Sequence, residues 1–142
     1  MTIPRGDASL ADIVATMPFA SALGIQLVHA RPDEVVATMP WSEDKTTVGG
    51  RLHGGAIMAF ADTVGALCAF VNLPPGAATS TIESKTNFFR GFSSGRLTAT
   101  STPLHVGNAT IVVRTDLVDD RGKPVAVVTQ TQIVIGAPAT PA

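Results

Sequence analysis

The sequence contains few of the residues that disulfide-linked, metal-binding and nucleic-acid-binding proteins need. Cys68 is the only cysteine among 142 residues, which excludes a disulfide framework within the chain. The three histidines are scattered and offer no spacing typical of a zinc site. The chain has 10 Lys and Arg residues and 11 Asp and Glu residues, and the basic residues form no run. We therefore expect no metal ion and no nucleic-acid partner.

The sequence also has no long apolar run that is free of charge. Asp7 and Asp12 interrupt the N-terminal region, which lacks the basic start and unbroken apolar stretch of a signal peptide. Residues 54–71 are the most apolar stretch, but they only just reach the length of a membrane span. Asp62 lies in their middle, where a charge is costly in lipid. We therefore expect a cytoplasmic protein with no membrane partner.

The composition favours one compact domain that spans residues 1–142. Apolar residues make up 45% of the chain and charged residues only 15%, which argues against disorder. At this length roughly two-thirds of the unfolded surface can be buried, so one core is sufficient. The low charge content also suits a chain that covers part of its surface with copies of itself.

The residue pattern predicts two strands, one long helix and four further strands, after a short N-terminal helix at about 8–16. Pro18 ends the first helix, because the residue before a proline disfavours helical geometry. A polar loop at 42–51 precedes the long helix, which runs from 54 to about 71 and is apolar almost all round, a pattern that predicts burial. The strands are expected at 25–30, 34–41, 79–89, 95–106, 110–118 and 124–135, and the tail at 137–142 is expected to fray.

This order predicts an α+β protein in which an antiparallel sheet of about six strands wraps around one long central helix. The connections between the last four strands are short, so they allow antiparallel neighbours but not parallel crossovers. A helix that covers one face of a curved sheet satisfies the layer rule. The arrangement is that of a hotdog fold.

The segment His53-Gly54-Gly55 lies where the loop becomes the long helix. The first N–H groups of a helix have no intrahelical partners and lie at the positive end of the dipole. Two glycines there let a ligand oxygen approach the backbone closely, as the oxyanion of an acyl-transfer reaction must. Alternatively, the glycines only fit a tight junction and His53 caps the helix.

Asp62 is the only charged residue in the long apolar helix. A buried carboxylate is costly unless it has partners, and general bases often occupy such environments. Alternatively, Asp62 is satisfied by nearby backbone or by Thr63, or is exposed at an edge. Asp62 follows His53 by nine residues. On a helix, the two side chains would therefore point to opposite sides of the axis and lie about 13 Å apart along it. A site with both groups therefore needs a second subunit.

The run Leu52-His53-Gly54-Gly55, with Asp62 nine residues after the histidine and strands on both sides, resembles hotdog-fold acyl-CoA thioesterases. The nearest branch is the phenylacetate-degradation type of the 4-hydroxybenzoyl-CoA thioesterase superfamily, and the resemblance covers roughly residues 20–135. It implies that the Gly54 N–H polarises the thioester carbonyl and that His53 orients this region. It also implies that Asp62 of the opposite subunit activates water or attacks the carbonyl.

The resemblance extends to further positions, with one departure. It assigns Ser80, with Thr81 beside it, to holding the attacking water or assisting the acid. Related enzymes commonly carry Asn or Gln six residues before the histidine, whereas this chain has Thr47, which lacks an amide's paired donors. The segments that resemble coenzyme A contacts supply Asn87, Arg90, Gly91, Gly107 and Asn108. Arg90 is the cation expected to pair with phosphate, although it and the Gly107-Asn108 turn also fit ordinary surface roles.

We therefore predict a thioester hydrolase that converts an aryl- or medium-chain acyl-CoA to the free acid and coenzyme A. The coenzyme is part of the substrate, and no separate cofactor is expected. The enzyme is expected to be a homo-oligomer, a dimer or a dimer of dimers (a homotetramer), with sites shared between subunits. Two alternatives remain: a non-catalytic acyl-CoA binding or sensing module, which Thr47 favours, and an acyl-thioester dehydratase or hydratase, which Gly-Gly after His53 disfavours. Cys68 is expected in the core.

Overall fold

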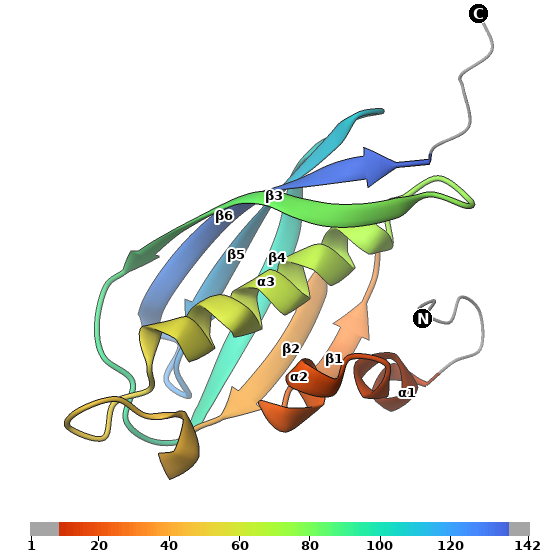
Figure 1. The fold of residues 1–142 in the computed structure, drawn as a ribbon. Coiled ribbons are helices and arrows are strands. Elements are labelled where there is room, and N and C mark those ends of the chain that lie inside the picture. The colour runs from red at the N-terminus through yellow and green to blue at the C-terminus, as the bar shows by residue number, and fades with distance from the viewer. Residues whose placement is uncertain (1–8, 137–142) are drawn as a thin grey trace, which may run out of the picture.

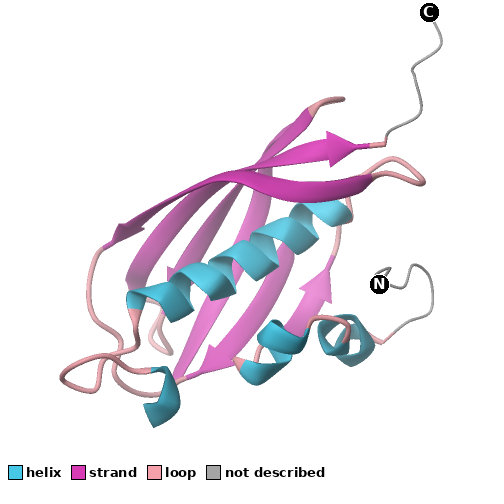
Figure 2. Cartoon of the chain, in the orientation of Figure 1, coloured by secondary structure: helices cyan, strands magenta, loops and turns pink. Residues whose placement is uncertain are grey.

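The computed structural model describes residues 9–136 (Figures 1 and 2). Residue 8 of the predicted first helix and the predicted frayed tail at 137–142 lie outside the described residues. The elements, in chain order, are α1 (Leu10–Ala15), α2 (Pro18–Ala22), β1 (Gln26–Ala30), β2 (Val35–Pro40), the short 3-10 helix η1 (Glu43–Lys45), α3 (Gly54–Phe70), β3 (Ala78–Phe88), β4 (Arg96–Val106), β5 (Thr110–Val118) and β6 (Pro124–Ile135).

The sheet has six strands in the order β1-β2-β4-β5-β6-β3, and every neighbouring pair is antiparallel. It curves around α3, which lies along its concave face, while α1 and α2 lie beside β1 (Figure 1). This confirms the predicted α+β architecture of one long helix wrapped by an antiparallel sheet. Strand β3 forms one edge of the sheet, so one of its two sides has no strand partner within residues 9–136.

Strands that follow one another in the sequence are also neighbours in the sheet for β1–β2, β4–β5 and β5–β6. This does not hold for β2–β3 or for β3–β4. Residues 89–95 instead carry the chain from β3 at one edge to β4, which pairs with β2 and β5. Phe92 in this connection is buried, and its carbonyl accepts a hydrogen bond from the Leu52 N–H at 2.7 Å. The connection is therefore fixed against the loop that precedes α3 and does not form a tight hairpin.

The N-terminal region has one helix more than the sequence predicted. Ser9 and Asp12 form a capping box at the start of α1, and that helix ends before Pro18 as expected. Pro18 then begins α2, because its fixed φ and missing N–H suit the first position of a helix. A proline therefore ends one helix and starts the next.

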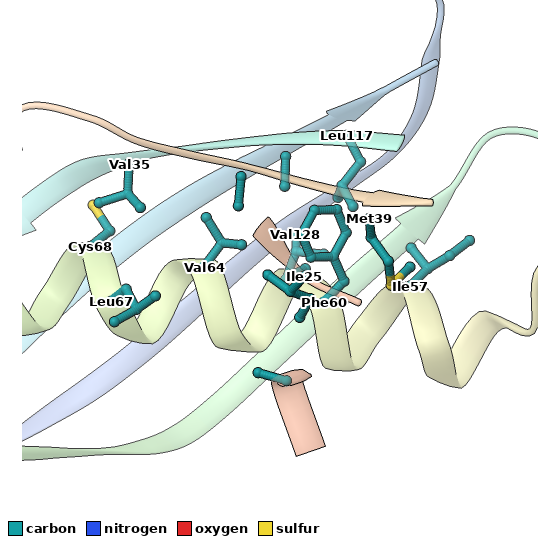
Figure 3. Packing of buried hydrophobic residues seen from close by; sticks show 14 of the residues in the cluster. Ile25, Val35, Met39, Ile57, Phe60, Val64, Leu67, Cys68, Leu117 and Val128 are labelled. Carbon is teal, nitrogen blue, oxygen red and sulfur yellow. The ribbon is translucent and has the colours of Figure 1, made fainter. Parts of the chain in front are cut away.

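The core lies between α3 and the concave face of the sheet (Figure 3). Phe60 and Val64 on α3 pack with inward-facing residues of the strands, among them Met39, Leu117 and Val128. These side chains are fully buried, as the apolar alternation of the strands predicts. The helix is not buried all round, however, because Met58 is 40% exposed in the chain taken alone.

Phe60→Ala is expected to lower the free energy of unfolding by about 3–5 kcal/mol, because the substitution removes a fully buried ring and leaves a cavity. Urea denaturation measures this change. Phe19 of α2 is 67% exposed, so Phe19→Ala is the matched control, with an expected change within about 0.5 kcal/mol. Equal losses in the two variants would contradict the assignment of the core.

Candidate active site

The start of α3 is shaped by His53, which is the N-cap residue. Its Nδ1 accepts a hydrogen bond from the Gly55 N–H at 2.8 Å. A Cβ atom on Gly55 would lie 3.0 Å from Nδ1, so the missing side chain lets the imidazole fold back onto the helix. The capping role that the sequence allowed for His53 is therefore present in the structure.

The N–H of Gly54 has no hydrogen-bond partner among residues 9–136. His53 satisfies the other donors of the first turn, since its carbonyl accepts from Ala56 and Ile57. A Cβ on Gly54 would lie 3.3 Å from the ring of Phe88, at the end of β3. The free donor thus lies at the positive end of the helix dipole, beside an aromatic ring.

The loop before α3 is tied to the N-terminal part of the chain through Lys45. Its ammonium donates to the carbonyls of Leu23 at 2.8 Å and Pro40 at 2.6 Å. Burial lowers the pKa of Lys45, and nearby Asp44 opposes this shift to a smaller extent. The Lys45 carbonyl in turn accepts from the His53 N–H at 2.9 Å. This lysine therefore positions the start of α3.

Thr47 lies at the exposed tip of the same loop. Its N–H donates to the Arg51 carbonyl at 2.8 Å, and its own carbonyl accepts from the Gly50 N–H at 3.2 Å. The indole N–H of Trp41 donates to the Gly50 carbonyl and fixes the tip. No hydrogen bond within the described part of the chain joins the Thr47 side chain to another group.

Asp62 lies halfway along α3, half-buried against β3 and β6. Its Oδ1 accepts a hydrogen bond from the Thr81 hydroxyl at 2.8 Å and another from the Gln130 amide at 3.2 Å. Ser80 is exposed, because neighbouring residues of a strand face opposite sides of the sheet. The structure therefore places Thr81 on Asp62, and Ser80 on the other face of β3.

Sequence reasoning missed Thr81 as the direct partner of Asp62 and missed Gln130 and Gln132 altogether. The signal was present in β6, where Val128, Gln130 and Gln132 share one face by alternation. Two glutamines in line with a buried valine mark a polar cluster inside the core.

Gly54 and Asp62 are eight residues apart on one unbroken helix, so about 12 Å of rise separates them. Both lie next to β3, Gly54 near Phe88 and Asp62 near Thr81. One small reacting group cannot contact both of them in a single chain. A site that used both groups at one reacting centre would therefore need a second chain, and this stays a prediction.

Residues 49–126 match the thioesterase superfamily. The chain belongs to that superfamily. A thioesterase of Haemophilus influenzae with a solved structure is 28% identical, with a TM-score of 0.85 over 94% of this chain and 95% of its own. A mutant thioesterase of Pseudomonas aeruginosa is 27% identical, also with a TM-score of 0.85, over 94% of this chain and 99% of its own.

A curated relative extends the comparison to a named reaction. The 1,4-dihydroxy-2-naphthoyl-CoA hydrolase of Escherichia coli is 28% identical over 101 residues, which are 71% of this chain and 74% of that protein. This chain therefore has the hotdog fold and is a thioester hydrolase, as predicted.

Arg90, the cation expected to pair with phosphate, already forms hydrogen bonds within its own chain. Its guanidinium donates to Asp119 at 2.6 Å and to the carbonyls of Lys123 and Pro124 at 3.0 and 2.9 Å. It therefore clamps the turn between β5 and β6. Gly91 beside it leaves room for the Arg51 side chain, because a Cβ there would lie 2.7 Å from the Arg51 Cδ.

The five expected coenzyme A contacts lie at opposite ends of the sheet. Asn87, Arg90 and Gly91 are at the end of β3, near the start of α3. Gly107 and Asn108 are in the turn between β4 and β5, which lies near the start of β3 because Ala109 bonds to Val134 of β6. The structure does not bring the two groups together within one chain.

Cys68 occupies the core position that the sequence predicts. Cys68 is buried in the core, and burial raises the pKa of its thiol to about 11, with a smaller effect from Asp33. Among residues 9–136, no group of three His, Cys, Asp or Glu side chains is arranged to hold a metal ion. In the same range, no helix has the length and apolar character to cross a bilayer.

The turn that Arg90 clamps is expected to make stability depend on pH. The pKa of Asp119 is lowered, first by the hydrogen bond from the Lys123 N–H and then by bonds from Arg90 and the Arg121 N–H, while burial opposes the shift. The stabilisation is therefore present above the unfolded pKa of about 3.9 and is lost as pH falls through the lower folded value.

Asp119→Asn should accordingly lower the melting temperature at pH 7, and the difference from wild type should shrink as pH falls from about 4 downward. Thermal melts across this pH range measure it. A difference of constant size down to the lowest pH would contradict the role of the Asp119 charge.

Proposed function

We propose that this thioesterase hydrolyses an acyl-CoA whose acyl group is apolar, either aryl or medium-chain, to the free acid and coenzyme A. The observation that supports the proposal is that one helix carries both a free backbone N–H donor and a half-buried carboxylate. The Gly54 N–H has no partner among residues 9–136, and Asp62 lies against the same strand. These are the two groups that acyl transfer to water requires.

The reaction then follows from the chemistry of the two groups. The Gly54 N–H donates to the thioester oxygen and stabilises the negative charge that develops there. Asp62 takes a proton from water, and the resulting hydroxide adds to the carbonyl carbon. The tetrahedral intermediate collapses, the C–S bond breaks, and the coenzyme A thiolate leaves and is protonated. Direct attack by the carboxylate, followed by hydrolysis of the anhydride, gives the same products.

Edge strand β3 suggests how two chains build one site. Asp62 contacts Thr81, and Gly54 lies next to Phe88, seven residues further along the strand. If β3 pairs antiparallel with β3 of a second copy about a two-fold axis near Ser84 and Lys85, the two positions exchange. Asp62 of each chain then lies beside Gly54 of the other, and a closed dimer has two equivalent sites.

Exposure along β3 favours this pairing. The strand has 11 residues, most of them exposed, and its free side offers unpaired backbone groups. Proteins rarely leave a long flat edge uncovered, because it pairs readily with other strands. The same pairing would bring Gly107 and Asn108 of one chain towards Asn87 and Arg90 of the other. The proposed homodimer, alone or as half of a tetramer, therefore assembles the coenzyme A contacts as well.

Three exposed apolar side chains support an apolar acyl group. Met58 lies on α3 midway between Gly54 and Asp62, four residues from each. Ile82 and Phe88 of β3 are 58% and 49% exposed. The named substrate of the E. coli relative, 1,4-dihydroxy-2-naphthoyl-CoA, is an aromatic acyl thioester. An aryl-acyl substrate of the phenylacetate-degradation type is consistent with both observations.

Replacing Gly54 by proline removes its N–H and so tests the oxyanion donor. Proline suits the first position of a helix, and the extended backbone of His53 accepts a following proline. Gly54→Pro should lower kcat by about 10²–10³-fold. Gly54→Ala adds the same Cβ next to Phe88 but keeps the N–H, so it is the matched control and should retain most activity. Equal losses would mean that crowding by the Cβ, and not the missing donor, causes the defect.

Thiol release from a panel of phenylacetyl-, hydroxyphenylacetyl-, benzoyl-, short-chain and long-chain acyl-CoA measures these rates. Asp62→Asn should lower kcat by about 10²–10⁴-fold on every substrate that the wild type cleaves. Full turnover by a folded Asp62→Asn protein would refute the assignment of the base. Release of thiol from none of the panel would refute the proposed substrate class.

Coexpression of Gly54→Pro and Asp62→Asn chains tests the shared site. Half of randomly paired dimers are mixed, and in each of these one of the two sites has both groups intact. The mixture should therefore recover about a quarter of wild-type activity, although each variant alone is inactive. No recovery in dimers that are shown to be mixed by two affinity tags would place Gly54 and Asp62 of one chain in the same site.

A further inference from the structure

Two hydrogen bonds hold the same oxygen of Asp62 and leave the other one free. Oδ1 accepts from the Thr81 hydroxyl and from the Gln130 amide. No hydrogen bond within residues 9–136 reaches Oδ2, and this atom is not sealed in the core. The carboxylate is therefore fixed through one oxygen, and the other remains available to a ligand.

The bond from Thr81 belongs to a chain with a fixed direction. The Gln132 amide donates to the Thr81 hydroxyl oxygen at 2.6 Å. Because that oxygen is already an acceptor from Gln132, its own proton points to Asp62. Gln132 is fully buried, and its carbonyl oxygen accepts from Thr79 at 3.2 Å. Each group in this chain limits the rotation of the next.

Gln130 lies in a space that depends on a glycine. It is fully buried, and a Cβ on Gly65 would collide with its Oε1 and lie 2.5 Å from its Cδ. Oε1 has no hydrogen-bond partner in the described range 9–136, which is costly for a buried polar atom. An apolar residue like its neighbour Val128 would avoid that cost. Among the described residues, Asp62 is the only one that the Gln130 amide N–H groups reach, at its carboxylate Oδ1 (3.2 Å) and at its backbone carbonyl (3.4 Å).

We propose that Gln130 and Thr81 are positioning residues for Asp62: they hold Oδ1 so that Oδ2 faces the thioester, with Gly65 providing the space for Gln130. This inference rests on the proposed role of Asp62 as the base. Neither residue touches the substrate. Without them the carboxylate rotates about its broad terminal torsion and spends less time in the reactive orientation.

Kinetics separate positioning from binding and from stability. Gln130→Leu and Thr81→Val should each lower kcat by up to about 10²-fold, with KM within about twofold of wild type, because only the base is misplaced. Thr81→Ser keeps the hydroxyl and should restore kcat. Thr115→Val is the matched control, because it deletes the buried hydrogen bond to Ser101 on the same face of the sheet, and among residues 9–136 neither hydroxyl bonds to Asp62. It should lower the melting temperature and leave kcat unchanged.

Gly65→Ala provides an independent test that leaves every polar group in place. The added methyl group would collide with the fully buried Gln130 side chain, so the melting temperature should fall whichever role Gln130 has, but a purely structural role predicts an unchanged kcat. The positioning role predicts that the methyl group displaces the Gln130 amide and lowers kcat at constant KM. This variant and the Thr81 pair decide the matter if Gln130→Leu does not fold.

The outcomes distinguish the two levels of the proposal. Wild-type kcat in folded Gln130→Leu and Thr81→Val, while Asp62→Asn is inactive, overturns the positioning role and leaves the base assigned. Full activity in Asp62→Asn overturns both. A fall in kcat for Thr115→Val equal to that for Thr81→Val also overturns positioning, because the loss would then reflect core damage in general.

Discussion

The packing of α3 against the concave face of the sheet is the interaction on which the rest of the structure depends. It removes Phe60, Val64 and their partners from water, and this burial is the main source of stability. It also holds the helix rigid, so the spacing between residues along it is fixed. The free N–H at Gly54 and the carboxylate of Asp62 are held about 12 Å apart, and both face one edge strand. The proposed division of the site between two chains rests on that spacing.

Periodicity was enough to predict most of the architecture. The alternation in β4, β5 and β6 and the apolar helix placed these elements within a residue or two of their positions. The edge position of β3 could not be read from the sequence, because it depends on pairing with β6, whose partners lie between 38 residues (Phe88 and Ala126) and 57 residues (Ala78 and Ile135) away. Nor could α2, since the proline that ends α1 is compatible with a new helix as well as with a loop.

The sequence drew attention to the start of α3 and to Asp62, but not to the side chains that contact Asp62. His53, Gly54 and Asp62 stand out because a junction glycine and a lone charge break the local pattern. Thr81 and Gln130 depend on which face of each strand meets α3, and one position along β3 decides between Ser80 and Thr81. Arg90 was predicted to bind phosphate, but in the structure it donates to Asp119 of its own chain. Nothing in the sequence near Arg90 indicates that this partner exists.

The pairing of β3 with β6 sets the order in which the protein can be completed. Asp62, Thr81 and the whole of α3 are synthesised well before Gln130 and Gln132. Until the last strand arrives, the Asp62 carboxylate lacks the Gln130 amide, and β3 lacks the strand with which it pairs within the chain. Contacts between distant segments form slowly during folding. The final strand therefore does two things at once: it joins β3 to the rest of the sheet and places the Gln130 amide beside the Asp62 carboxylate.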